Sequence, residues 1–98
     1  MKKISAKRSK QLYQMIRAEE SRHNYEARFT PRERVIIDLI SKGRTTKEIA
    51  RHLKCSPRTI EGHRKSLLSK TGARNVAELA RYAVVDELRS ILRRNFLR

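Results

Sequence analysis

Three closely spaced signals for the start of a helix constrain the fold of this chain more than any other feature. They are "TPRE" at 30–33, "TTKE" at 45–48 and "SPRT" at 56–59. Each begins with a Ser or Thr that can cap a helix, and two place a proline at the first helical position. The first two also end on the glutamate of a capping box. The spacing predicts a series of short helices in an all-α fold.

Apolar residues recur at helical spacing behind each signal. Gly43 and Gly72 end the first and third predicted helices. A fourth helix opens at Asn75 with Glu78, and its periodicity continues to Leu92. The predicted buried faces are Val35, Ile36, Leu39 and Ile40; then Ile49, Ala50 and Leu53; then Ile60, Leu67 and Leu68 with Arg64 or His63; and last Val76, Leu79, Ala80, Ala83 and Val84.

Residues 1–28 form a basic extension whose structure is harder to predict. Leu12, Met15 and Ile16 would share one side of a helix, but the segment looks poorly capped. No Gly/Ser-rich linker separates a second domain. We therefore predict one domain over 29–98, preceded by this extension.

The chain is strongly basic, with 25 Lys+Arg against 10 Asp+Glu and a net charge of +15. Basic residues outnumber acidic ones by eight to three in 1–28, twelve to four in 29–74 and five to three in 75–98. This excess favours a polyanionic partner, with nucleic acid first and an anionic membrane surface second. The middle of the chain is the predicted docking region.

Other classes of protein fit the sequence poorly. No apolar run approaches the ~20 residues that span a bilayer, and no apolar stretch follows the basic start, so we predict a cytoplasmic, nucleoid-associated protein without membrane contact. Cys55 is single and is predicted to be a small buried hydrophobe. The three histidines lack metal-ligand spacing, and Glu33 and Asp38 read as a cap and an exposed helix residue. We predict no metal, cofactor, small-molecule ligand or enzymatic activity.

The second and third predicted helices are joined by only Lys54, Cys55 and Ser56. A turn this short forces a steep crossing, in which the first helix braces the second. One side of the third helix is polar and contains a glycine that permits close approach. Its members are Arg58, Glu61, Gly62, Lys65 and Ser69.

Residues 29–84 resemble the LuxR/FixJ-type helix-turn-helix domain of bacterial transcription regulators. The matching motifs are "TPRE", the turn at Gly43, "KEIA", "S-x-x-TI-x-x-H" and "K-x-GA-x-N" before the last helix. The resemblance implies a homodimer that binds double-stranded DNA with the helix at about 57–71 in the major groove. It also implies that the last helix forms the dimer contact.

The resemblance assigns roles to individual positions of this chain. Ordinary capping or surface charge is the alternative explanation for the residues near the helix starts. The implied base-facing residues are Glu61, Gly62 and Lys65, the phosphate contacts are Thr46, Lys47, Arg58, Thr59 and Ser69, and the dimer residues are Ala80, Val84, Leu88 and Ile91.

The sequence departs from the resemblance in three respects. The last helix is expected to continue about ten residues past the family's usual end, where Leu88, Ile91, Leu92 and Phe96 would either lengthen the dimer contact or cover the N-terminal helix. Thr71 stands where the family more often has Leu, which is expected to loosen the end of the third helix. Residues 1–28 are too few for the usual receiver or autoinducer-binding domain, so we predict a stand-alone regulator controlled by abundance or a protein partner. Two alternatives are a protein that dimerises with and blocks a larger regulator, and a DNA-binding protein like region four of a sigma factor.

Overall fold

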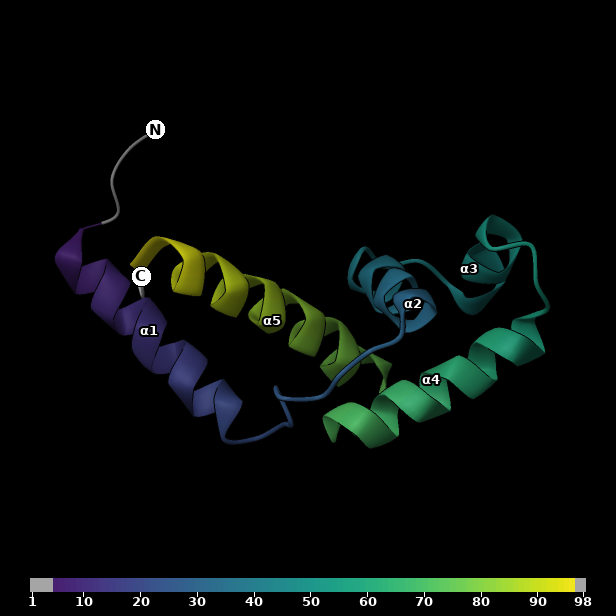
Figure 1. Ribbon diagram of the computed structural model, residues 1–98, viewed down its shortest axis with the longest axis horizontal. Coiled ribbons are helices and arrows are strands. Elements are labelled where there is room, and N and C mark those ends of the chain that lie inside the picture. The colour runs from purple at the N-terminus through teal and green to yellow at the C-terminus, as the bar shows by residue number, and fades with distance from the viewer. Residues whose placement is uncertain (1–4, 97–98) are drawn as a thin grey trace.

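The computed structural model describes residues 5–96, with only the backbone of Phe96 included (Figure 1). This part of the chain contains five helices and no strand, so the predicted all-α fold is confirmed. The helices are α1 Ala6–Glu20, α2 Pro31–Ser41, α3 Thr46–His52, α4 Pro57–Thr71 and α5 Val76–Phe96. In Figure 1, α2, α3 and α4 form one end of the molecule, and α1 lies beside the far half of α5 at the other end.

The helix starts lie where the sequence places them. Thr30 and Glu33 form a reciprocal capping box on α2, and Thr45 and Glu48 form another on α3. The Ser56 side chain accepts a hydrogen bond from the backbone of α4. At the other end of α4, Gly72 adopts a left-handed φ of 79°, which glycine tolerates without a Cβ clash.

The core lies between α2, α4 and α5, with α3 closing one end. The structure buries many of the residues that were predicted to form the core, namely Ile36, Ile40, Ile49, Ala50, Ile60, Leu67 and Leu79. The prediction is wrong for two valines, because Val35 and Val84 are exposed. Ile37 and Tyr82 are buried in their place, and Tyr82 is only 1% exposed. Both helices therefore present a slightly different side to the core than the apolar spacing indicated.

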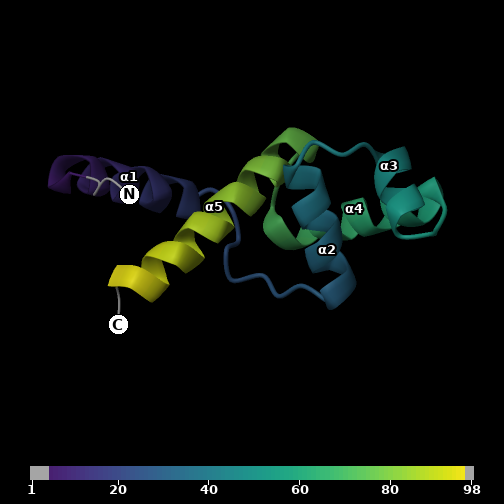
Figure 2. The same cartoon turned by 90° about the horizontal axis from the view of Figure 1, so that it is seen from above.

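The basic extension contains a helix that packs beside α5. Ser5 caps α1 by accepting a hydrogen bond from the Arg8 backbone N–H at 3.2 Å, so the expectation of poor capping is wrong. Ile16 is buried in the core, whereas Met15 is exposed. The Glu19 carboxylate lies 2.7 Å from the Arg81 guanidinium and joins α1 to α5. Figure 2 shows the two helices side by side and diverging towards the far end.

The segment between α1 and α2 ties this extension to the rest of the fold. The Tyr25 ring stacks on the Tyr82 ring with centroids 4.4 Å apart. Asn24 donates its backbone N–H to the Thr71 carbonyl at 2.8 Å and its side-chain amide to the Lys70 carbonyl at 3.2 Å. These bonds satisfy carbonyls at the end of α4 that would otherwise lack partners.

Thr71 does not loosen the end of α4. Its side chain is fully buried, and its hydroxyl donates to the Leu67 carbonyl at 2.8 Å. The same oxygen accepts the Ala73 backbone N–H at 3.1 Å. A threonine thus replaces the packing of a larger residue with hydrogen bonds that hold the last turn of α4 to the following loop.

Candidate nucleic-acid interface

The turn between α3 and α4 sets the angle of the two helices. Lys54 adopts a left-handed φ of 56°, a conformation that non-glycine residues seldom take. The Cys55 backbone N–H donates to the Ala50 carbonyl at 3.0 Å, and the Cys55 side chain is half-buried against the core. The predicted tight turn is confirmed, and Cys55 packs against the core but is less buried than predicted.

The outward side of α4 is polar and open. Arg58, Glu61, Gly62, Lys65 and Ser69 are all exposed, opposite the buried residues of the same helix. No atom of the fold lies within 4 Å of the position that a Cβ at Gly62 would occupy. The structure therefore brings the five predicted residues onto one accessible face, on which Gly62 adds no side chain above the backbone.

Three polar side chains connect this face to the start of α3. The Thr46 hydroxyl donates to Glu61 Oε1 at 3.0 Å, and Arg64 Nη1 donates to the same oxygen at 2.9 Å. Arg64 also donates to the Thr46 hydroxyl. Thr46 and Glu61 thus bond to each other, although the side chain of Glu61 remains 57% exposed. The sequence analysis placed Arg64 only on the inner face of this helix. The Arg64–Glu61 pair could have been predicted from their i, i+3 spacing, which brings two side chains together on a helix.

A second polar contact holds α4 against α2. Glu33 is buried, and its carboxylate accepts hydrogen bonds from Lys70 Nζ at 2.6 Å and from the Ser66 hydroxyl at 3.1 Å. Burial alone would raise the pKa of Glu33. The bonds from Lys70, the Thr30 backbone and Ser66 outweigh burial and lower the pKa from 4.5 to about 2. Glu33 therefore does more than cap α2, because it also fixes the tilt of α4.

Apart from Arg64, several basic side chains on or near this face lack acidic partners. Among the described residues, no carboxylate lies within 4.0 Å of Lys47, Arg58 or Lys65, nor of Arg51 in α3 and Lys54 in the turn before α4. Their positive charge is not neutralised within the fold, so it is available to an external anion. Of the other predicted phosphate contacts, Ser69 is exposed and the Thr59 hydroxyl lies 3.0 Å from the Ser56 hydroxyl at the start of α4.

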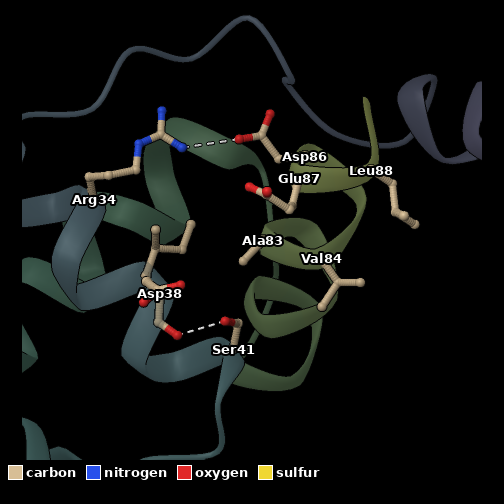
Figure 3. A pocket seen from close by; sticks show the side chains of 9 residues that line it. Arg34, Asp38, Ser41, Ala83, Val84, Asp86, Glu87 and Leu88 are labelled. Atoms are coloured by element: carbon tan, nitrogen blue, oxygen red, sulfur yellow. Dashed lines mark hydrogen bonds and ion pairs between the residues drawn. The ribbon is translucent and has the colours of Figure 1, made fainter. Parts of the chain in front are cut away.

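The predicted dimer residues lie along one side of α5. Val84 is 52% exposed and Ile91 is also exposed, while Ala80 and Leu88 are half-buried. In Figure 3, the Val84 and Leu88 side chains extend from α5 away from Arg34 of α2. Half-buried and exposed residues thus alternate along the stripe, and Val84 and Ile91 are its open positions.

Two further features of residues 5–96 concern membranes and metals. No helix there is both long and apolar enough to cross a membrane. No group of three or more His, Cys, Asp and Glu side chains in this range is arranged to hold a metal ion.

Comparison with known proteins identifies the family. Residues 27–83 match the family described as "Bacterial regulatory proteins, luxR family". The chain is 46% identical over 56 residues to "Response regulator Rre1" of Synechocystis sp., covering 57% of this chain and 24% of that protein. It is 51% identical over 55 residues to "Transcriptional regulatory protein MctR" of Rhizobium johnstonii, covering 56% and 26%.

A third relative is matched over a longer stretch. The chain is 39% identical over 66 residues to "Probable transcriptional regulator ycf29" of Cyanophora paradoxa, covering 67% of this chain and 31% of the relative. The chain thus spans about a quarter to a third of the length of these relatives. No solved structure matches it. Since the family match covers more than half of the residues, including all of α2, α3 and α4, the chain belongs to the luxR family of bacterial regulatory proteins.

Proposed function

We propose that this chain is a sequence-specific DNA-binding transcription regulator that inserts α4 into the major groove. The observation that carries the proposal is the open polar face of α4, surrounded by cations without acidic partners among the described residues. A helix braced from behind by a second helix is the geometry that fits a major groove. The names of the relatives, which include transcriptional regulators, support the same role.

Lys65 and Gly62 are the proposed centre of base recognition. Lys65 can donate to guanine O6 and N7, while Gly62 lets the helix backbone approach the base edges. Glu61 lies beside them and can accept from cytosine N4, but only with a carboxylate already held by Thr46 and Arg64. Thr46 and Arg64 therefore orient the Glu61 carboxylate, and this orientation decides its base preference.

The remaining positions are proposed to bind phosphates. Lys47 and Arg58 are exposed and unpaired within the described chain, so they supply the charge. Ser69 and Thr59 contribute hydroxyls, whereas the Thr46 hydroxyl donates to Glu61 and could donate to a phosphate only by leaving that carboxylate. Such contacts fix the register of the protein on the duplex without reading its sequence.

We further propose that two copies bind a two-fold related site through α5. Val84 and Ile91 supply an exposed apolar stripe at the proposed dimer contact, flanked by Ala80 and Leu88. Replacing Val84 by Asp would bury a charge at this contact. Sedimentation should then find a monomer that binds half-sites weakly; an unchanged dimer would place the contact elsewhere.

A duplex titration tests the proposal directly. The logarithm of the binding constant should fall steeply with the logarithm of salt concentration, by about 0.9 per neutralised phosphate. Lys65→Ala should lose about 1–3 kcal/mol on the specific duplex and less on a random one. Lys47→Ala should weaken both duplexes equally. A flat salt response would overturn the proposal, and equal losses for both variants would move Lys65 among the phosphate contacts.

A further inference from the structure

An open hollow lies between the segment that follows α1 and the second half of α5. Its volume is about 370 Å³. Four arginines line it, namely Arg28 in the segment, Arg34 in α2, and Arg89 and Arg93 in α5, together with the carboxylates of Glu26 and Asp86. None of the lining residues comes from α3 or α4, so this arginine hollow is distinct from the proposed DNA face.

The two carboxylates are already engaged by two of the arginines. Asp86 accepts a hydrogen bond from Arg34 at 3.1 Å and lies 3.6 Å from the Arg89 guanidinium. Glu26 lies 3.5 Å from another nitrogen of Arg89. The guanidinium of Arg34 also lies over the ring of Phe29, 4.8 Å from its centre. Arg34 and Arg89 are therefore held in place by the fold.

Arg28 and Arg93 have no such partners. No carboxylate of the described chain lies within 4.0 Å of either, and both side chains are exposed at the rim of the hollow. The four arginines and two acids leave the lining with a net charge of +2. Like charges that converge on one hollow repel each other, and a bound anion would remove this repulsion.

We propose that the arginine hollow binds a phosphate-class anion through Arg28 and Arg93. Arginine forks match the oxygens of a phosphate, and charge-assisted bonds of this kind are stronger than neutral ones. The Ser90 hydroxyl, which also lines the hollow, offers another donor. The phosphate group can come from a free phosphorylated small molecule or from a DNA backbone, which share this chemistry.

A bound phosphate would connect parts of the chain that are distant in sequence. Arg28 lies in the connecting segment, where its carbonyl accepts a hydrogen bond from Lys70 of α4 at 3.3 Å. Arg93 lies near the end of α5, which carries the proposed dimer stripe. An anion shared by the two arginines therefore fixes the outer half of α5 to the segment beside α4.

Inorganic phosphate is the first probe. Phosphate is titrated against the isotope-labelled full chain at constant ionic strength, with chloride as the exchanged ion, while the backbone amides are followed by NMR. Saturable shifts are expected at Ala27, Arg28 and Ser90. The double variant Arg28→Ala/Arg93→Ala should bind about tenfold more weakly or worse, and Arg28→Lys/Arg93→Lys should fall in between because it keeps charge but loses the fork.

Lys7→Ala/Lys10→Ala is the matched control. It removes the same charge from exposed positions near the start of α1, so phosphate affinity should stay unchanged. Shifts that do not saturate, or that are the same in Arg28→Ala/Arg93→Ala, would overturn the proposal. Circular dichroism of each variant checks that the fold is kept.

A duplex titration then identifies the source of the phosphate. If duplex shifts the same amides and free phosphate competes with it, the hollow takes a backbone phosphate. If duplex binds and leaves these amides unmoved, the hollow takes a free phosphate compound. Failure to bind any duplex would overturn the proposed function, while the phosphate titration would still decide the arginine hollow.

Discussion

Two regions of the molecule use basic residues in opposite ways. We call the angle formed by α3 and α4 the corner, and the contact of α1 with α5 the seam. In the seam, Arg81 lies 2.7 Å from Glu19, and Arg89 reaches Glu20 and Asp86. At the corner, Lys47, Arg58 and Lys65 have no carboxylate within 4.0 Å in the described part of the chain. Arg81 and Arg89 in the seam hold the protein together, whereas Lys47, Arg58 and Lys65 at the corner have no such structural pairing. Net charge alone does not distinguish these two uses.

Arg89→Ala should break the seam and give the largest effect. The Arg89 side chain is only 11% exposed, and it also lies over the Tyr25 ring, 5.0 Å from the centre. Its removal leaves Glu20 and Glu26 without a described partner, although Asp86 keeps Arg34, and it also removes the bond to the Tyr25 carbonyl. The free energy of unfolding should fall by about 3 kcal/mol, because Arg89 is a nearly buried cation. Urea denaturation followed by circular dichroism measures the change.

The control for this prediction is Arg58→Ala at the corner. Its free energy of unfolding should stay within about 0.5 kcal/mol of the original, because Arg58 is exposed and unpaired in the described structure. Its duplex affinity should fall instead. Similar losses of stability in both variants would remove the distinction between seam and corner.

Glu33 sharpens the comparison, because it forms an internal ion pair in the half that carries the proposed DNA face. Its pKa is lowered from 4.5 to about 2, so the folded state binds the proton less well than the unfolded chain. The contribution of Glu33 is therefore complete above pH 4.5 and is lost as the pH falls towards 2. Its loss should cost roughly 1–3 kcal/mol. Denaturation from pH 6 to pH 2 should give a shallower pH dependence for Glu33→Gln than for the original chain.

Thr46→Val tests whether hydrogen bonds inside the fold also stabilise the corner between α3 and α4. The variant removes the hydroxyl that bonds Glu61 and Arg64 and should cost about 1 kcal/mol of stability. If Glu61 is oriented by this hydroxyl, base preference should change together with stability. A duplex selection that returns the same preferred sequence would show that the cluster does not act on recognition.

Lys42→Ala should give the smallest effect. Lys42 and Asp38 form an ion pair on α2 at 3.1 Å, but both side chains are more than half exposed. Such a pair contributes at most about 0.5 kcal/mol because water and salt screen it. A loss as large as that of Arg89→Ala would show that exposure does not separate structural pairs from incidental ones.

The local signals in the sequence predicted the helix ends well. Thr30, Thr45 and Ser56 each cap the helix that follows, and Gly72 ends α4. These features depend on residues within one helical turn, so the sequence contains the whole interaction. The face of α4 was predictable for the same reason, since residues at i, i+3, i+4 and i+7 share a side in any α-helix.

The side of a helix that meets the core was less predictable. Both errors, Val35 and Val84, fall in continuous apolar runs, "VII" at 35–37 and "AVV" at 83–85. A rotation of the helix about its axis changes which residue of such a run faces the core. Only packing against the neighbouring helices selects one of them. The pairing of Arg89 and the stacking of Tyr25 on Tyr82 join residues far apart in the chain, so local patterns contained no sign of them.

Asn24 makes the last turn of α4 depend on a residue 46 positions earlier in the chain. If α1 slid along α5, the two donors of Asn24 would move away from the Lys70 and Thr71 carbonyls, and that turn would fray. The rigidity of α4, and with it the lifetime of a bound complex, would then vary with the placement of α1. Substitutions in α1, away from the proposed DNA face, would then raise or lower the affinity of that face by degrees.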